Sequence, residues 1–191
     1  MNAATTVERE IKLAFETAEA ARAAIVAAGA TPLLGRRLQE DALLDTADEQ
    51  LRARGCALRV RVECGKSRLT FKGTPQPGIM KLREELETVV GDGEILLRVL
   101  RELGLDVWFR YEKYREEFSH EDVIVAIDET PVGVFVEIEG SEAGIATMAE
   151  ALGRSQADYL VDSYRSLFLQ HREQRGLEGQ DMVFDTVDAR I

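Results

Sequence analysis

The sequence predicts an α+β protein built on an antiparallel sheet or a closed barrel. Three observations support this prediction: about eight segments with strand character, about four with helix character, and hairpin connections in place of regular β–α alternation. The chain has 191 residues, of which 45% are hydrophobic, so one domain with a sizeable core is expected. A doubly wound parallel fold does not fit this order of segments.

The expected strands alternate apolar and polar residues or are rich in β-branched and aromatic side chains. Segments 67–72 and 80–90 form a predicted hairpin, because the KGTPQPG connection contains two prolines and two glycines. The full set of expected strands is 7–15, 37–45, 56–63, 67–72, 80–90, 107–118, 122–129 and 132–139.

The expected helices begin at residues whose side chains can cap a helix, namely Thr17, Asp92 and Ser141. The second helix carries one apolar stripe, made of Ile95, Leu96, Val99, Leu100 and Leu103. Together the helices cover about 17–28, 92–103, 141–152 and 162–175, and the charged stretch 46–55 has room for a short one. From Gly176 the tail is polar, and we expect it to be loosely held.

Charge and composition restrict the possible partners. The chain has 24 basic and 35 acidic residues, a net charge of −11, which disfavours nucleic acid and anionic membranes unless positive charge is concentrated locally. No apolar run approaches the roughly 20 residues of a membrane span, and the first residues lack a secretory pattern, so we expect a cytoplasmic protein. Cys56 and Cys64 form no CxxC pair, which argues against a cysteine zinc site.

Charged residues recur on alternate positions of the expected strands, and alternate positions share one face. The sets on one face are Glu8, Glu10 and Lys12; Arg59 and Arg61; Arg83, Glu85 and Glu87; Lys113 and Arg115; and Glu137 and Glu139. Lys72 and Asp128 lie at strand ends. Apolar residues occupy the opposite positions of several strands, for example Ile11, Val60 and Ile138.

A single charged face is readily explained by exposure to water, as in any half-buried antiparallel strand. Six strands with the same arrangement suggest another possibility. If the strands close into a barrel whose apolar positions pack against outer helices, seven acids and seven bases line one cavity. Uncompensated charge there would be very costly, so such a lining indicates a ligand site.

The residue types in this lining suggest the ligand. Seven cations suit a compact polyanion, and arginine can bind phosphate through two parallel hydrogen bonds. Carboxylates without histidine or cysteine are hard oxygen ligands, appropriate to Mg²⁺ or Mn²⁺. A glycosidase also uses two carboxylates, but it would not require seven cations around them.

These residues resemble the CYTH superfamily, the triphosphate tunnel metalloenzymes, which include class IV adenylate cyclases and thiamine triphosphatases. Glu8-x-Glu10-x-Lys12 matches the ExExK signature of that family. Further matching segments follow in order over about residues 7–170: DALLDTADEQLRARGCALRVR, LTFKG, LREELE, KYR, AIDETPVGVFVEIEG and DSYRSLF.

The resemblance implies an eight-stranded antiparallel β-barrel, a tunnel with helices packed outside, that binds a linear triphosphate with Mg²⁺ or Mn²⁺. One such domain would occupy residues 1–175, followed by the polar tail 176–191. Lys12 matches the signature and is the candidate catalytic group. The phosphate-binding positions implied are Arg59, Arg61, Lys72, Lys113 and Arg115, to which we add Arg83 from its place in the lining. The metal-binding positions implied are Glu8, Glu10, Glu137 and Glu139, with Glu85 and Asp128 as contributors.

One position departs from the family pattern. In the thiamine triphosphatases that this chain resembles, a tyrosine stands two residues before the Asp-Thr pair and is expected to act with the lysine in water activation. This chain has Leu43 at that position. A thiamine-triphosphatase mechanism is therefore not expected. We expect Tyr164, on the last helix, to be a packing residue.

We therefore expect a metal-dependent phosphohydrolase that acts on inorganic triphosphate or a nucleoside triphosphate. Two alternatives stay open: a class IV adenylate cyclase that forms cyclic AMP and pyrophosphate from ATP, and a polyphosphate binder without turnover. The expected partner is the small-molecule triphosphate alone, without nucleic acid or membrane. A homodimer formed through the outer helices is possible.

Overall fold

A closed barrel of eight antiparallel strands forms the centre of the computed structural model, which describes residues 6–185. Around the barrel the strands follow the order β1, β5, β4, β3, β2, β6, β7 and β8, and β8 pairs with β1 again. The strands are β1 (Thr6–Phe15), β2 (Thr31–Asp45), β3 (Ala57–Glu63), β4 (Lys66–Lys72), β5 (Lys81–Val90), β6 (Asp106–His120), β7 (Val123–Thr130) and β8 (Gly133–Gly140). The predicted fold class is confirmed.

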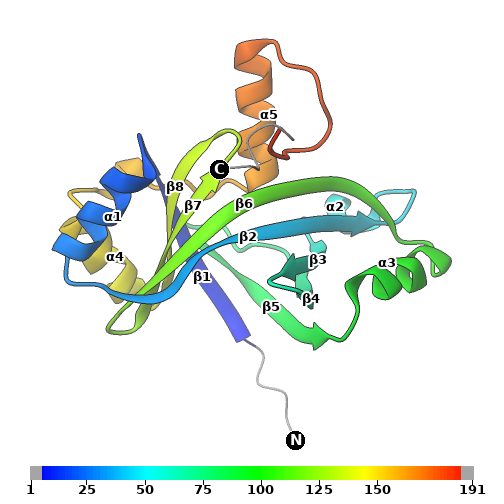
Figure 1. Cartoon of the computed structure of the whole chain (residues 1–191), viewed down its shortest axis with the longest axis horizontal. Helices are drawn as coiled ribbons and strands as arrows, with labels where there is room; N and C mark the ends of the chain where they lie inside the picture. The colour runs from blue at the N-terminus through cyan, green and yellow to red at the C-terminus, as the bar shows by residue number, and fades with distance from the viewer. Residues whose placement is uncertain (1–5, 186–191) are drawn as a thin grey trace, which may run out of the picture.

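The helices lie outside this barrel (Figure 1). They are α1 (Ala18–Ala27), α2 (Gln50–Ala53), α3 (Gly93–Glu102), α4 (Glu142–Ala151), the 3₁₀ turn η1 (Gln156–Asp158) and α5 (Tyr164–Arg175). Figure 1 shows α1 and α4 together on one side, α3 on the far side, and α5 apart from the others. Within residues 6–185 none of the helices has the length and apolar character needed to cross a membrane.

Three helices begin where the sequence predicts. The side chains of Thr17, Asp92 and Ser141 each accept a hydrogen bond from a backbone N–H three residues later, which satisfies a donor that the helix itself leaves free. The charged stretch 46–55 contains the short helix α2. Here the Asp45 carboxylate accepts hydrogen bonds from the backbone N–H groups of Leu51 and Arg52.

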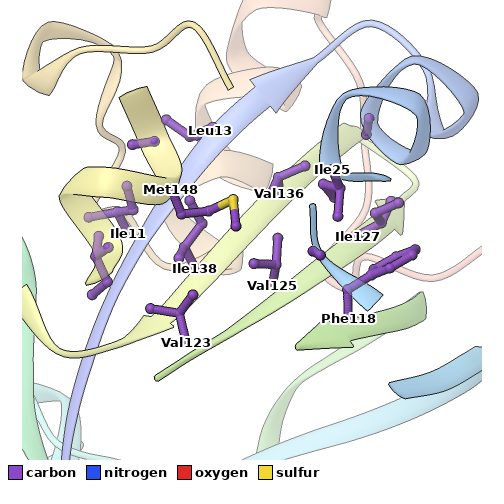
Figure 2. Packing of buried hydrophobic residues seen from close by; sticks show 14 of the residues in the cluster. Ile11, Leu13, Ile25, Phe118, Val123, Val125, Ile127, Val136, Ile138 and Met148 are labelled. Carbon is purple, nitrogen blue, oxygen red and sulfur yellow. The ribbon is translucent and has the colours of Figure 1, made fainter. Parts of the chain in front are cut away.

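The main core lies between the outer face of the barrel and helices α1 and α4 (Figure 2). Ile11 of β1 and Ile138 of β8 face Ile25 of α1 and Met148 of α4, and all four are buried. Because side chains alternate along a strand, burying these residues outside the barrel turns their charged neighbours inward. Each fully buried Ile or Met stabilises the fold by about 1.5–3 kcal/mol.

The apolar stripe of α3 is only partly used. Leu100 is buried against Leu44 and Val60, but Ile95 and Val99 are about half exposed. The predicted helix is present, but only part of its apolar stripe is buried. The main strand contacts of the helix are with β3 and β4, and Leu86 and Val89 of the adjoining β5 are exposed.

Strand β2 begins at Thr31, earlier than the predicted segment 37–45. Pro32 and Gly35 disfavour a regular strand, and the pairing with β6 shifts register at Pro32/Leu34 and Leu34/Arg37. Irregular pairing of this kind lets an edge accommodate a proline, which has no N–H to donate.

The prediction of a loosely held tail was wrong for the part that the structure describes. Met182 is 1% exposed and exchanges two backbone hydrogen bonds with β6, one to Arg110 and one from Glu112. β6 is longer than β7, so its first half has a free edge, and the tail covers part of it. Residues 186–191 of the predicted tail lie outside the described residues.

Ile127→Ala in the main core is expected to lower the free energy of unfolding by about 2–5 kcal/mol, through lost burial and the cavity left behind. Ile127 is 1% exposed, whereas Ile124 on the same strand is 38% exposed and serves as the control. Urea denaturation measures both variants. An equal loss for Ile124→Ala would contradict this placement of the core.

Candidate active site

The barrel encloses a cavity of about 390 Å³, a volume typical of small-molecule sites. Eleven lysine and arginine side chains and eight glutamates line it. The chain as a whole carries a net charge of −11, so the lining reverses the sign of the molecule. Positive charge is concentrated in a cavity large enough for a compact polyanion.

Twelve of the thirteen predicted site residues line this one cavity. The cationic ones are Lys12, Arg59, Arg61, Lys72, Arg83, Lys113 and Arg115, and the acidic ones are Glu8, Glu10, Glu85, Glu137 and Glu139. The exception is Asp128, which lies behind the cavity wall. The predicted convergence is therefore found, while the chemical role of each residue stays a prediction.

Lys12 lies at the centre of the pairing between β1 and β8. Its Nζ is 3.0 Å from Glu10 Oε1 and 3.2 Å from Glu137 Oε2, and the residue is 2% exposed. Burial alone would lower the pKa of Lys12, but the two carboxylates outweigh burial and raise it above its usual range. Lys12 is thus a fixed positive charge at neutral pH.

A second cluster surrounds Asp128 of β7. Arg115 donates to both carboxylate oxygens, at 2.7 and 2.6 Å, and Lys113 Nζ donates to Oδ2 at 2.8 Å. Burial would raise the pKa of Asp128, but these two cations lower it to about 2. Asp128 is fully buried behind them, so its position favours holding Lys113 and Arg115 over binding a metal in the cavity.

A third cluster joins β1, β4 and β5. Glu8 accepts hydrogen bonds from Lys72 Nζ at 2.5 Å and from Arg83 Nε at 3.0 Å. Lys72 also forms an ion pair with Glu85 at 2.7 Å. Charges from three strands are held together in this way, so each side chain has a defined position before any ligand binds.

Several residues of the site were missed by the sequence prediction. Asp41 of β2 is buried and pairs with Arg61 at 2.8 Å and with Arg59 at 3.4 Å. Lys81 of β5 pairs with Glu10 at 3.0 Å. The alternation rule finds both, because Asp41 is opposite Arg61 in the β2–β3 hairpin and Lys81 shares a face with Arg83.

Tyr164 was predicted to be a packing residue, and this prediction is only half right. Its ring is buried against Tyr111 and Phe135, as packing requires. It also lines the cavity, and its hydroxyl donates a hydrogen bond to Asp128 Oδ2. No local sequence signal indicates this contact, because it joins α5 to a strand 36 residues earlier in the chain.

An apolar cluster covers one end of the barrel. Leu43, Phe109 and Phe135 from the strands pack there against Phe168 of α5. Leu43 is also part of the cavity wall at this end. The charged lining therefore continues toward the opposite end, where Arg37 pairs with Glu63 and Glu117.

Glu139 differs from the other carboxylates in the cavity because no lysine or arginine among the described residues forms an ion pair with it. Its side chain is open to the cavity, yet surrounding protein atoms partly desolvate it. Desolvation and the nearby charges of Glu8, Glu137 and Glu10 raise the pKa of Glu139 to about 7. This crowding of negative charge is a place where a cation would be stabilised.

The donor chemistry fits a divalent cation. Glutamate oxygens without histidine or cysteine are the ligands that Mg²⁺ and Mn²⁺ prefer. Within the part of the chain that the structure describes, no three such side chains already converge as a preformed metal site. Glu8, Glu10 and Glu137 are engaged by lysines and arginines, so binding a metal there requires some of these ion pairs to rearrange.

A closed eight-stranded antiparallel barrel around a charged cavity defines the class of tunnel-like β-barrel proteins. The family is given by comparison with known sequences: the model of the CYTH domain matches residues 6–164. The chain belongs to the CYTH family.

One related sequence is "Putative adenylate cyclase MJ0240" of Methanocaldococcus jannaschii, 33% identical over 111 residues. The match covers 58% of this chain and 63% of that protein, which is less than two thirds of its length.

Solved structures share the fold. A "putative adenylate cyclase" from Vibrio parahaemolyticus has a TM-score of 0.75 and 18% identity, covering 86% of this chain and 99% of that one. The PH1012 protein from Pyrococcus horikoshii has a TM-score of 0.72 and 25% identity, with coverages of 84% and 98%. A "putative adenylyl cyclase" from Hippeastrum, described as having a dominant triphosphatase activity, has a TM-score of 0.65 and 22% identity, with coverages of 85% and 95%.

Glu139→Gln is expected to make the metal-free protein more stable than wild type, by an amount that grows between pH 4.5 and about 7. A carboxyl group whose pKa is raised by folding is protonated in the native state over this interval but ionised in the unfolded state. Wild-type stability therefore falls as pH rises, and the glutamine variant lacks that loss. Urea denaturation with a chelator at several pH values measures the difference. A difference that does not change with pH would contradict the assignment.

Proposed function

We propose that this protein is a metal-dependent phosphohydrolase that acts on a triphosphate compound, either inorganic triphosphate or a nucleoside triphosphate. The observation that carries the proposal is the excess of lysine and arginine over glutamate in an enclosed cavity of a strongly acidic chain. A polyanion is the ligand that such a lining stabilises.

The lysines and arginines of the tunnel would bind and orient the phosphates. Arg59 and Arg61 lie two residues apart on β3, and Arg115 lies on β6, so they can neutralise charge on different oxygens of one extended anion. Lys12, held by Glu10 and Glu137, keeps its proton and would stabilise charge that develops on the transferred phosphoryl group. Mg²⁺ or Mn²⁺ held by Glu10, Glu137 and Glu139 would add positive charge next to the attacking and leaving oxygens.

Cyclisation of ATP is the second candidate function, because the related proteins from Methanocaldococcus jannaschii and Vibrio parahaemolyticus each carry the description "putative adenylate cyclase". Hydrolysis and cyclisation differ in whether water or the ribose hydroxyl attacks. Among the described residues, the cavity wall has three aliphatic side chains, Leu34, Leu43 and Ala57, and two aromatic rings, Tyr111 and Tyr164. Both rings are packed in the apolar cluster at one end. Charged side chains make up most of the wall, which favours hydrolysis, as does the triphosphatase activity described for the Hippeastrum protein.

The test is product analysis after incubation with tripolyphosphate or ATP and Mg²⁺ or Mn²⁺. Orthophosphate as the product supports hydrolysis. Cyclic AMP with pyrophosphate supports the cyclase and overturns the preference. Tight binding of tripolyphosphate without any product, under either metal, leaves the protein a polyphosphate binder. A chelator is expected to abolish turnover.

Lys12→Ala is expected to lower kcat by about 100-fold or more, since it removes a positive charge aimed at the reacting phosphoryl group. The loss of stability is expected to be small, because Glu10 keeps Lys81 and Glu137 keeps Arg115 as ion-pair partners. Phosphate release and thermal denaturation measure the two effects. Glu137→Ala is expected to lower activity in the same way.

Lys66→Ala is the matched control, because Lys66 is exposed at the start of β4 and does not line the cavity. It is expected to leave turnover unchanged. Full turnover in a Lys12→Ala, Glu137→Ala double variant would refute the roles given to these two residues.

A further inference from the structure

We infer that Tyr164 is a positioning residue of this site, through which the first turn of α5 fixes Lys12, Lys113 and Asp128. This inference rests on the proposed function and concerns the same cavity. Three contacts carry it: the tyrosine hydroxyl bonds to Asp128, its ring lies over both lysines, and the chain leading into α5 is bonded to the backbone of Lys12.

The hydroxyl completes the surroundings of a buried carboxylate. Asp128 has no exposed surface, and it already accepts hydrogen bonds from Lys113 and Arg115. A carboxylate can accept about four hydrogen bonds, and Tyr164 provides one without adding charge. Asp128 is therefore fixed from a third direction, and the two cations that it holds are fixed with it.

The ring of the same tyrosine acts on the lysines directly. Lys113 Nζ lies 4.7 Å and Lys12 Nζ 5.3 Å from the ring centroid, within the range of a cation–π attraction. These two lysines come from β6 and β1, which are separated in the barrel by β7 and β8. The ring of Tyr164 thus lies within reach of both ammonium groups.

The position of Tyr164 is set by the backbone before it. Leu160 donates to the Lys12 carbonyl and accepts from the Lys12 N–H, both at 2.9 Å. This short antiparallel bridge continues the edge of β1 beyond its pairing with β5. Because the bridge is made to Lys12 itself, the tyrosine four residues later cannot move far from that lysine.

The contacts assign positioning and not catalysis to Tyr164. Its hydroxyl is committed to Asp128, which lies behind the cavity wall, so it acts on the polyanion only through Lys113 and Arg115. Many other cations would still hold the substrate if the hydroxyl were lost. Misplacement of a few groups around the reacting phosphorus lowers turnover much more than binding.

The test compares Tyr164→Phe and Tyr164→Leu with Phe168→Leu. Removing the hydroxyl is expected to lower kcat by about 10-fold, and removing the ring as well by about 100-fold, with KM changed by less than about 3-fold. Phe168 packs in the same apolar cluster of α5 but does not line the cavity. Phe168→Leu is therefore expected to lower the melting temperature while leaving kcat unchanged.

A measurement without substrate separates this inference from the proposed function. The ring current of Tyr164 is expected to shift the ε-methylene proton signals of Lys12 and Lys113 in NMR spectra. The shifts should persist in Tyr164→Phe and disappear in Tyr164→Leu. Those shifts in a protein that turns over no triphosphate would support the placement of the lysines and refute the proposed function.

Three results would overturn the inference itself. The first is wild-type kcat in Tyr164→Leu. The second is absence of the lysine shifts in the wild-type protein. A loss of kcat in Phe168→Leu as large as that in Tyr164→Phe would also overturn it, because the effect would then follow from general packing of α5.

Discussion

Mutual compensation of opposite charges inside a closed barrel is the constraint on which the rest of this structure depends. Removing one partner of a buried ion pair leaves a charge without compensation, at a cost of several kcal/mol. The barrel meets this constraint by register: Lys12 is opposite Glu137 across β1 and β8, and Arg61 is opposite Asp41 across β2 and β3. The same pairing that closes the sheet places each cation beside its counter-ion.

These ion pairs also prepare the cavity for exchange of partners. A polyanion that enters can replace carboxylates as the partner of lysine and arginine, and a divalent cation can replace lysine as the partner of glutamate. Glu10 forms ion pairs with both Lys12 and Lys81. When one of these lysines changes partner, the other still compensates the charge of Glu10. Binding then costs less desolvation than it would in an apolar cavity.

The alternation of charged and apolar residues predicted most of the cavity lining for a closed barrel, while the choice of an eight-stranded barrel over an open sheet came from the resemblance to the CYTH family. Ile11 and Ile138 point outward because helices cover them, and this fixes the direction of Glu10 and Glu137. The contribution of Tyr164 could not be predicted in this way, because it depends on where α5 returns to the barrel. The split stripe of α3 has a similar cause: periodicity shows that a face is apolar, but tertiary contacts decide how much of it is covered.

The contrast between a cationic interior and an acidic exterior has a consequence for how a ligand arrives. At low ionic strength, where the Debye length is about 30 Å in 0.01 M salt, an incoming polyanion meets the field of the whole molecule, whose net charge is −11. Attraction begins only near the mouth of the tunnel. Added salt should therefore speed the encounter, opposite to ordinary electrostatic steering, and a triphosphate already neutralised in part by a divalent ion would be admitted faster than the bare anion.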